Sequence, residues 1–66
     1  MLIELNGERR EVTVGTTVAE LVEQATERRR GVAVAREGEV VPRSEWPQTE
    51  LAEGDRVEIL QAVQGG

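Results

Sequence analysis

The clearest reactive group in this sequence is the carboxylate at its end, where VEILQAVQGG closes on Gly65 and Gly66. Glycine makes up roughly 7% of average composition, so two glycines end a chain by chance in about 0.5% of proteins. A frayed tail is one interpretation. The alternative is that Gly66 is the reactive end of the molecule, and the other residues must decide between the two.

Side chains that most often carry catalysis are missing from the rest of the chain. The 66 residues include no cysteine and no histidine, which excludes a thiol nucleophile, a disulfide and a thiolate metal site. The commonest general base is excluded as well. We therefore expect no enzyme active site and no bound metal or cofactor in this chain.

Charge and hydropathy limit the partners and the compartment. The net charge of −5 repels phosphate backbones, so no nucleic-acid partner is expected. The apolar runs are too short to cross a bilayer, and MLIELNGERR lacks the basic-then-apolar order of a signal peptide. These patterns predict a cytoplasmic protein with no membrane partner. All 8 basic residues are arginine, so no side-chain amine is present for isopeptide bonds.

The first fourteen residues predict a β-hairpin. Met1, Ile3 and Leu5 fall on one face and Glu4 on the other, as expected for a strand. Asn6-Gly7 is the strongest short hairpin signal, because both residues tolerate the positive φ of a type I′ turn. On the returning strand, Val12 and Val14 are expected to face the core.

A change of period after Gly15 predicts one amphipathic helix. Its apolar stripe consists of Val18, Leu21, Val22 and Ala25. Thr17 and Glu20 have the spacing of a capping box at its start. We expect the last turn to contain Arg28–Arg30, whose cations would face the negative end of the helix, and Gly31 to stop it.

Short strands and one irregular segment follow the helix. We expect Val32–Ala35 to be a buried strand and Glu37-Gly38 to turn the chain into a strand at EVV. Residues 42–51, with two prolines and no sustained period, predict a loop with one short 3₁₀ turn. Trp46 is the only aromatic residue, and we interpret it as a packed lid on the core.

The last strand, RVEILQAV, is predicted after a turn at 53–55, with Val57 and Ile59 inward. The resulting order, β-β-α-β-β-β, predicts a single two-layer α+β domain over residues 1–66. First and last strands can pair in parallel at the sheet centre. This is the β-grasp, or ubiquitin-like, fold: a mixed sheet of four to five strands, one main helix on one face, and a flexible tail at 63–66.

These features resemble the small ubiquitin-like sulfur carrier family of thiamine (thiazole) biosynthesis. Four stretches carry the resemblance over nearly the whole chain: IELNG, VGTTVAEL, VAVAREGEVVPRSEW and LAEGDRVEILQAVQGG. The most specific part is VVPRSEW, in which a Val-Pro-Arg segment precedes Trp46 by two residues.

The resemblance implies a chemistry for Gly66. An E1-like adenylating enzyme would activate its carboxylate with ATP and magnesium, and a persulfide donor of the cysteine desulfurase type would replace AMP with sulfur. Thiazole synthase would accept that sulfur from the thiocarboxylate. Gly65, without a Cβ, would let the tail thread a narrow channel. A chain without cysteine can hold transferable sulfur at its carboxyl end and hardly anywhere else.

The resemblance also implies a docking surface beside the tail, where ubiquitin-like proteins usually bind their activating enzymes. Alternation along the last strand places Leu60 and Ala62 on the solvated sheet face. Both are candidate partner contacts, although an ordinary exposed residue is an equally good interpretation of Ala62. Val63 and Gln64 are expected to become ordered only in a complex. The acidic excess favours a partner with a basic rim.

Three other functions remain open. The small subunit of molybdopterin synthase shares the fold, the Gly-Gly end and the thiocarboxylate chemistry, but resembles PPVSGG at its end, where this chain has QAVQGG. A ubiquitin-like protein modifier would form an amide between Gly66 and another protein. A passive β-grasp binding module, from a different class, performs no acyl chemistry and does not need a Gly-Gly end.

Overall fold

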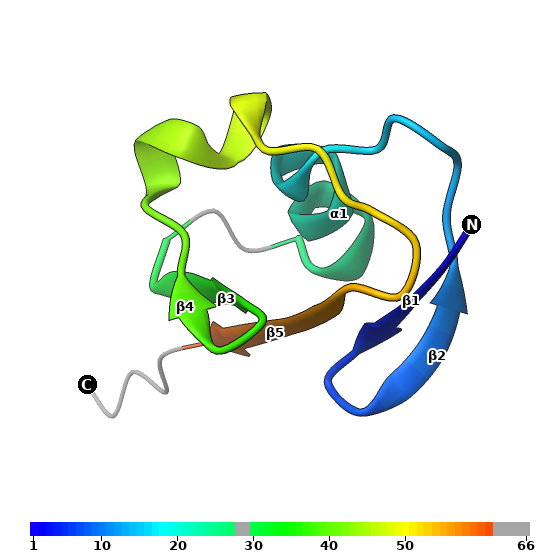
Figure 1. Ribbon diagram of the computed structural model, residues 1–66. Coiled ribbons are helices and arrows are strands. Elements are labelled where there is room, and N and C mark those ends of the chain that lie inside the picture. The colour runs from blue at the N-terminus through cyan, green and yellow to red at the C-terminus, as the bar shows by residue number, and fades with distance from the viewer. Residues whose placement is uncertain (28–29, 62–66) are drawn as a thin grey trace.

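Five strands and one α-helix succeed one another in the order predicted. The computed structural model describes residues 1–27 and 30–61 (Figure 1). Its elements are β1 (Leu2–Leu5), β2 (Glu8–Glu11), α1 (Val18–Ala25), β3 (Val32–Arg36), β4 (Glu39–Val40), the 3₁₀ helix η1 (Arg43–Gln48) and β5 (Arg56–Gln61).

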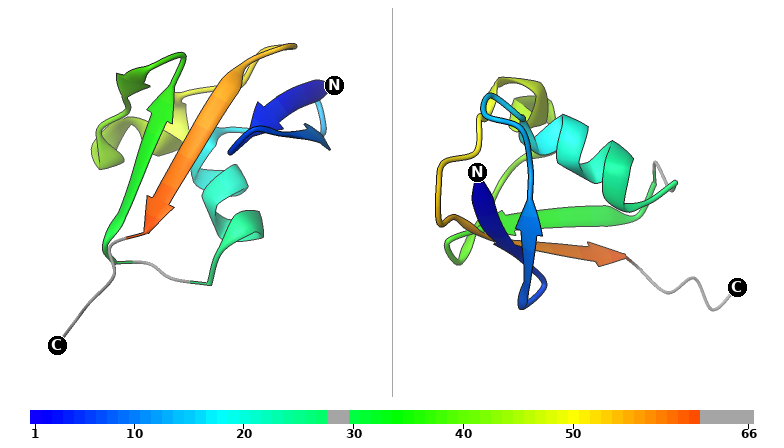
Figure 2. Two further views of the ribbon diagram at one scale, coloured as in Figure 1. Left: turned by 90° about the horizontal axis from the view of Figure 1, so that it is seen from below. Right: turned by 90° about the vertical axis from the view of Figure 1, so that its right-hand side faces the viewer.

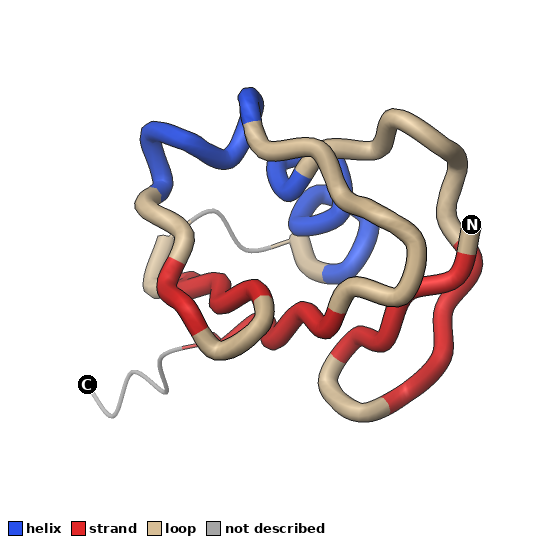
Figure 3. The backbone as a smooth tube through the Cα atoms, viewed as in Figure 1, coloured by secondary structure: helices blue, strands red, loops and turns tan. Residues whose placement is uncertain are grey.

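The strands form one mixed sheet in the order β2-β1-β5-β3-β4, so the last strand is central. Strands β1 and β5 run parallel, with Glu4 opposite Arg56 and Leu5 opposite Val57. The other pairs are antiparallel. Helices α1 and η1 lie over the same face of the sheet (Figures 2 and 3). The predicted α+β β-grasp architecture, with its parallel central pair, is confirmed.

One hydrophobic core fills the space between α1, η1 and the sheet. Val18 and Leu21 of α1 and Val34 of β3 are almost completely buried. The remaining buried hydrophobic residues are Ile3, Leu5, Val12, Val22, Val41, Trp46, Leu51, Val57 and Ile59. Two layers thus share one core, as expected for a chain of this size.

The predicted hairpin turn and the predicted capping box at the helix start are both confirmed. Asn6 and Gly7 have φ values of 50° and 83°, the positive values that a type I′ turn requires. At the start of α1, the Glu20 backbone N–H donates to Thr17 Oγ1 at 3.2 Å. The Thr17 N–H donates to Glu20 Oε1 at 2.9 Å, which completes the capping box.

The prediction that Val14 faces the core is wrong, because its side chain is 79% exposed. Strand β2 ends at Glu11, so strand alternation stops before Val14 is reached. The chain then turns tightly at Thr13, whose carbonyl accepts hydrogen bonds from the Thr16 N–H at 3.1 Å and from Thr16 Oγ1 at 2.6 Å.

The predicted extension of the helix to the arginine run is also wrong. Helix α1 ends at Ala25, which is exposed, and its last turn holds no basic residue. Thr26 is extended, with φ −151° and ψ 148°, and its N–H closes the last helical bond to the Val22 carbonyl. A β-branched residue loses side-chain freedom in a helix, which favours a stop at Thr26. Arg28 and Arg29 lie outside the described residues.

Trp46, the only aromatic residue, covers the core as a lid, as predicted. It lies in η1 with 6% of its surface exposed, and its Nε1–H donates to the Val41 carbonyl at 2.9 Å.

The strand expected after the helix, at Val32–Ala35, is present but only partly buried. In β3, Val34 is buried but Ala33 is exposed, because the small residues of the Val-Ala-Val-Ala segment face away from α1.

Candidate functional site

The central strand β5 leads directly to the tail. Val57 and Ile59 face the core with 1% and 7% exposure, whereas Leu60 is 61% exposed. The predicted register of this strand is therefore confirmed. Strand β5 ends at the side of the domain opposite the N-terminus (Figures 1 and 2).

The remaining predicted site residues follow β5 in the sequence. Ala62, Val63, Gln64, Gly65 and Gly66 lie outside the described residues, so their assigned roles stay predictions.

An apolar strip crosses the sheet face opposite α1, which we call the outer face. Leu60 lies opposite Ala33 in the β3–β5 ladder, and Ala35 lies opposite Val40 in the β3–β4 ladder. Residues paired in this way point to the same side of a sheet. Val40 is 76% exposed. The apolar strip, formed by Leu60, Ala33, Ala35 and Val40, thus runs from the end of β5 to the sheet edge.

A shallow depression lies at the tail end of this strip. Its volume is about 440 Å³, and it is lined by Gly31, Val32, Ala33, Leu60 and Gln61. An apolar side chain from a partner could therefore pack against the apolar strip and enter the depression next to the end of β5.

Charged residues occupy the other half of the outer face. Glu4 of β1 lies between Arg9 of β2 and Arg56 of β5, each in register with it. Glu58, next along β5 on the same side, is also exposed. The outer face is thus divided into an apolar half on β3–β4 and a mainly charged half on β1–β2, where Leu2 of β1 is also 44% exposed. Such a division favours one orientation of a docked partner over others.

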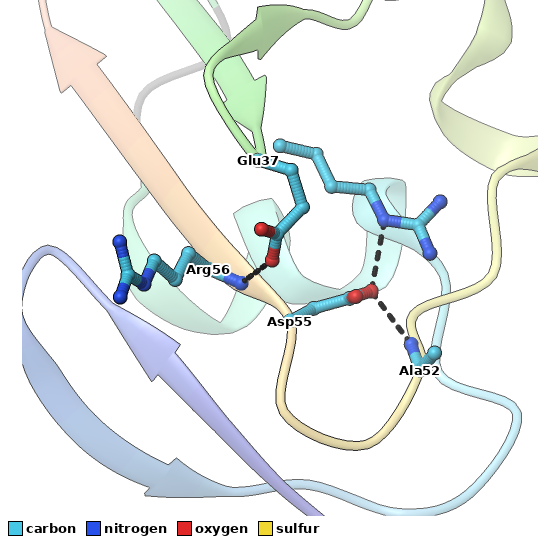
Figure 4. A network of polar contacts seen from close by, with 5 residues as sticks. Glu37, Ala52, Asp55 and Arg56 are labelled. Carbon is cyan, nitrogen blue, oxygen red and sulfur yellow. Dashed lines mark hydrogen bonds and ion pairs between the residues drawn. The ribbon is translucent and has the colours of Figure 1, made fainter.

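The start of β5 is fixed by a network of polar contacts (Figure 4). Asp55 is 8% exposed, and its Oδ2 accepts from Arg36 Nε at 2.8 Å and from the Ala52 N–H at 2.7 Å. The Arg56 N–H donates to Glu37 Oε2 at 2.6 Å. These contacts join the β3–β4 turn to the loop before β5. We interpret them as structural, because they satisfy a buried carboxylate.

A second groove, between α1 and η1, has a volume of about 490 Å³. Ala19 and Val22 form its apolar wall, and the Arg43 guanidinium lies 5.3 Å from the centroid of the Trp46 ring. The groove wall therefore contains a cation–π pair. Together with the Trp46–Val41 hydrogen bond, this pair gives the VVPRSEW segment a structural role.

Within residues 1–27 and 30–61, no group of three or more potential ligands is arranged to hold a metal ion. No helix in the same ranges is long and apolar enough to cross a membrane.

Comparison with known proteins identifies the family to which the chain belongs. The model of the ThiS family matches residues 3–66. The chain belongs to the ThiS family of sulfur carrier proteins. It is similar to the sulfur carrier protein ThiS of Escherichia coli (strain K12), with 36% identity over 66 residues and complete coverage of both chains.

Solved structures agree with this family and with the fold. The crystal structure of the thiamine biosynthesis protein ThiS from Geobacter metallireducens superimposes with a TM-score of 0.85 at 30% identity, covering 100% of both chains. A solution structure of a thiamine biosynthesis protein from the same organism gives a TM-score of 0.83 at 30% identity, with 88% of that chain covered.

One similar protein is much longer. A thiazole synthase from Paramagnetospirillum magneticum is 36% identical over 66 residues, which are 100% of this chain but 20% of that protein. A domain similar to this ThiS family member therefore occurs there as part of a larger chain.

Sequence reasoning identified Leu60 but missed the rest of the apolar strip. The signal for Ala33 and Ala35 was present in Val-Ala-Val-Ala, where the smaller residue occupies every second position. Val40 was harder to find, because β4 has only 2 residues and its neighbour Val41 is also apolar.

Proposed function

We propose that this protein carries sulfur for thiazole formation in thiamine biosynthesis, with the carboxyl group of Gly66 as the carrying group. The proposal rests chiefly on the family match, which extends through Gly65 and Gly66 to residue 66. It is supported by the sequence position of these glycines, which follow the central strand after residues 62–64, and by the exposed apolar strip at the end of that strand.

The chemistry begins with a carboxylate, which is inert to sulfur nucleophiles. Its oxygen attacks the α-phosphorus of ATP, bound with magnesium by an E1-like enzyme, and pyrophosphate leaves. The product is an acyl adenylate, a mixed anhydride with AMP as a good leaving group. Adenylation therefore makes the carbonyl carbon of Gly66 reactive.

Sulfur then replaces AMP. The terminal sulfur of a persulfide, carried by a donor of the cysteine desulfurase type, attacks the carbonyl carbon and expels AMP, forming an acyl disulfide. A second thiol attacks the donor's sulfur, so that the S–S bond breaks and the new disulfide forms on the donor side. Gly66 keeps the transferred sulfur as a thiocarboxylate, which thiazole synthase consumes.

The apolar strip and the tail have separate tasks in this proposal. Leu60 and its neighbours, together with Ala62, dock the partner, and Val63 and Gln64 lead the chain into its active site. Five residues such as 62–66 span at most about 16–18 Å when extended. Gly65 and Gly66 bring no Cβ to the narrowest part of the channel. A docking surface next to the tail is therefore needed to hold the reacting carbon in place.

The similar segment within a thiazole synthase supports that enzyme as the sulfur acceptor. Covalent linkage raises the effective concentration of one domain for another, typically to the millimolar range for short linkers. A carrier that is not linked to its acceptor must reach it through a docking surface.

Exchange of labelled pyrophosphate into ATP tests the activation step. In the presence of an E1-like enzyme from a thiamine pathway and magnesium, exchange should depend on this protein. A passive binding module would give no exchange above the enzyme alone, and that result would reject the proposal. Exchange followed by amide-linked conjugates of Gly66, without sulfur transfer, would instead identify a protein modifier.

A further inference from the structure

One side chain in the β1–β2 turn contacts β5 in the way a peptide group would. The Ile59 N–H donates to Asn6 Oδ1 at 2.8 Å, and Asn6 Nδ2 donates to the Ile59 carbonyl at 3.2 Å. The carboxamide thus satisfies both backbone groups of Ile59 on this side of the strand.

This contact continues a ladder that the backbone of β1 cannot complete. The Glu4 N–H donates to the Asp55 carbonyl at 2.8 Å, and the Asn6 N–H donates to the Val57 carbonyl at 2.9 Å. The next step would reach Ile59, but the chain reverses at Asn6-Gly7. The side chain of Asn6 therefore holds β5 one step beyond the end of β1.

Both backbone groups of Ile59 therefore bond to Asn6 on the β1 side, whereas its register partner in β3, Val34, uses its carbonyl to accept from the Val41 N–H at 2.8 Å. Leu60 follows directly. Gln61, the last described residue of β5, pairs with Val32 and donates from Nε2 to Thr26 Oγ1 at 2.9 Å. On the β1 side, Asn6 gives the last hydrogen bonds to β5 before Leu60 among the contacts described.

We propose that Asn6 is a positioning residue for sulfur loading: it fixes the end of β5 so that Leu60 docks and the tail leaves in one direction. This inference rests on the proposed function. A displacement of about 1 Å at a reacting group can lower a rate on the order of 10²-fold. A loosened strand end would therefore slow adenylation while the docking side chains stay intact.

The two roles of Asn6, in the turn and in the clamp, can be separated by substitution. Glycine also adopts the positive φ of a type I′ turn, so Asn6→Gly keeps the turn and removes the carboxamide. Asn6→Asp keeps the turn preference and the acceptor for the Ile59 N–H, but removes the donor to the Ile59 carbonyl.

The other hairpin supplies a matched control. Glu37 also has a positive φ, 52°, precedes a glycine, and accepts from a backbone N–H of β5 at 2.6 Å. That bond is made by Arg56, at the start of the strand rather than at its end. Glu37→Gly therefore removes a comparable turn-to-strand contact far from the tail.

The experiment measures pyrophosphate exchange with the full-length variants, at a temperature where circular dichroism shows each to be folded. Asn6→Gly should lower kcat roughly ten-fold or more and leave the KM for the carrier within about two-fold, with Asn6→Asp intermediate. Amide hydrogen exchange at Ile59, whose N–H donates to Asn6 Oδ1, and at Leu60 should accelerate in the same order. Glu37→Gly should change neither quantity.

An unchanged kcat in either Asn6 variant would overturn the inference, as would an equal loss in Glu37→Gly. A rise in KM alone would also overturn it, because Asn6 would then shape the docking surface instead of the tail direction. If Asn6→Gly does not fold, Asn6→Asp decides the matter. Failure of the wild-type protein to support exchange would reject the proposed function, and the amide-exchange comparison would still test the clamp.

Discussion

Leu60 and Ala33 lie directly opposite each other in the β3–β5 ladder, both with exposed side chains. The pairing joins the strand before the tail to the strand after the helix. Ala35 and Val40 continue the apolar surface by the same in-register geometry. The apolar strip therefore depends on pairing among three strands, and a substitution of Leu60 tests it at the end nearest the tail.

Leu60→Arg should weaken binding to the activating enzyme or to thiazole synthase, because a charged side chain would replace the apolar contact nearest the tail. Stability should change by no more than about 0.5 kcal/mol, as is usual for surface positions. Isothermal titration calorimetry measures the first effect and thermal unfolding the second. Val14→Arg is the matched control, since Val14 is 79% exposed and lies outside the sheet. Equal binding by both variants would exclude the strip as the docking surface.

Trp46→Ala should destabilise the domain by roughly 3–5 kcal/mol, because it removes a buried ring that closes one end of the core. Small domains have a total stability of about 5–15 kcal/mol, so much of the margin would be lost. Trp46→Phe keeps the ring but leaves the Val41 carbonyl without its donor, at a cost of about 1–3 kcal/mol. Urea unfolding measures both. A stable Trp46→Ala variant that has lost carrier activity would make Trp46 a partner contact instead.

Asp55→Ala should cost more than Arg36→Ala, although the two residues form one ion pair. Asp55 is buried and also accepts from the Ala52 N–H at 2.7 Å, so its loss removes two contacts at once. Arg36→Ala removes one of these contacts and leaves the bond to Ala52 in place, and the Arg36 side chain is 31% exposed, so its loss should cost less. Denaturant midpoints of the two variants give the comparison. Equal losses would mean that the ion pair itself dominates.

Most of the fold follows from local signals in the sequence. Asn6-Gly7 predicts its turn because both residues tolerate positive φ, and Thr17 with Glu20 predicts the helix start through mutual hydrogen bonds. The order of elements then predicts a parallel pair of first and last strands. These features depend on residue type and spacing alone, which is why they could be predicted.

The features that were predicted wrongly lie where a strand or a helix ends. Val14 was assigned to the core because strand alternation was continued past Glu11, where β2 ends. Ala25 was assigned to the buried stripe from its i+7 spacing after Val18, but it is the last residue of α1 and is exposed. In both cases a backbone change, at Thr13–Thr16 or at Thr26, ended a periodic pattern that the residues themselves would have allowed.

The candidate site likewise contains residues that a local pattern predicts and residues that it does not. Leu60 followed from alternation within one strand, whereas the contact of Asn6 depends on pairing between strands distant in sequence, and Val40 joins the strip through its pairing with Ala35 across the β3–β4 hairpin. The Asn6 side chain bonds a residue 53 positions away. Turn propensity explains why asparagine is favoured there, but the clamp on Ile59 requires the register of β1 against β5.

Replacement of one oxygen by sulfur at Gly66 tests the central claim most directly. Intact-protein mass spectrometry after incubation with activating enzyme, ATP, magnesium and a persulfide donor should show this mass gain, and the C-terminal peptide should carry it. Deleting Gly66 should abolish the gain, because the carboxyl group would fall short by about 3.3–3.6 Å, while folding is retained. Gly65→Val should reduce it through a branched side chain in the channel. Normal sulfur loading of the Gly66 deletion, or a mass gain mapped elsewhere in the chain, would contradict the account.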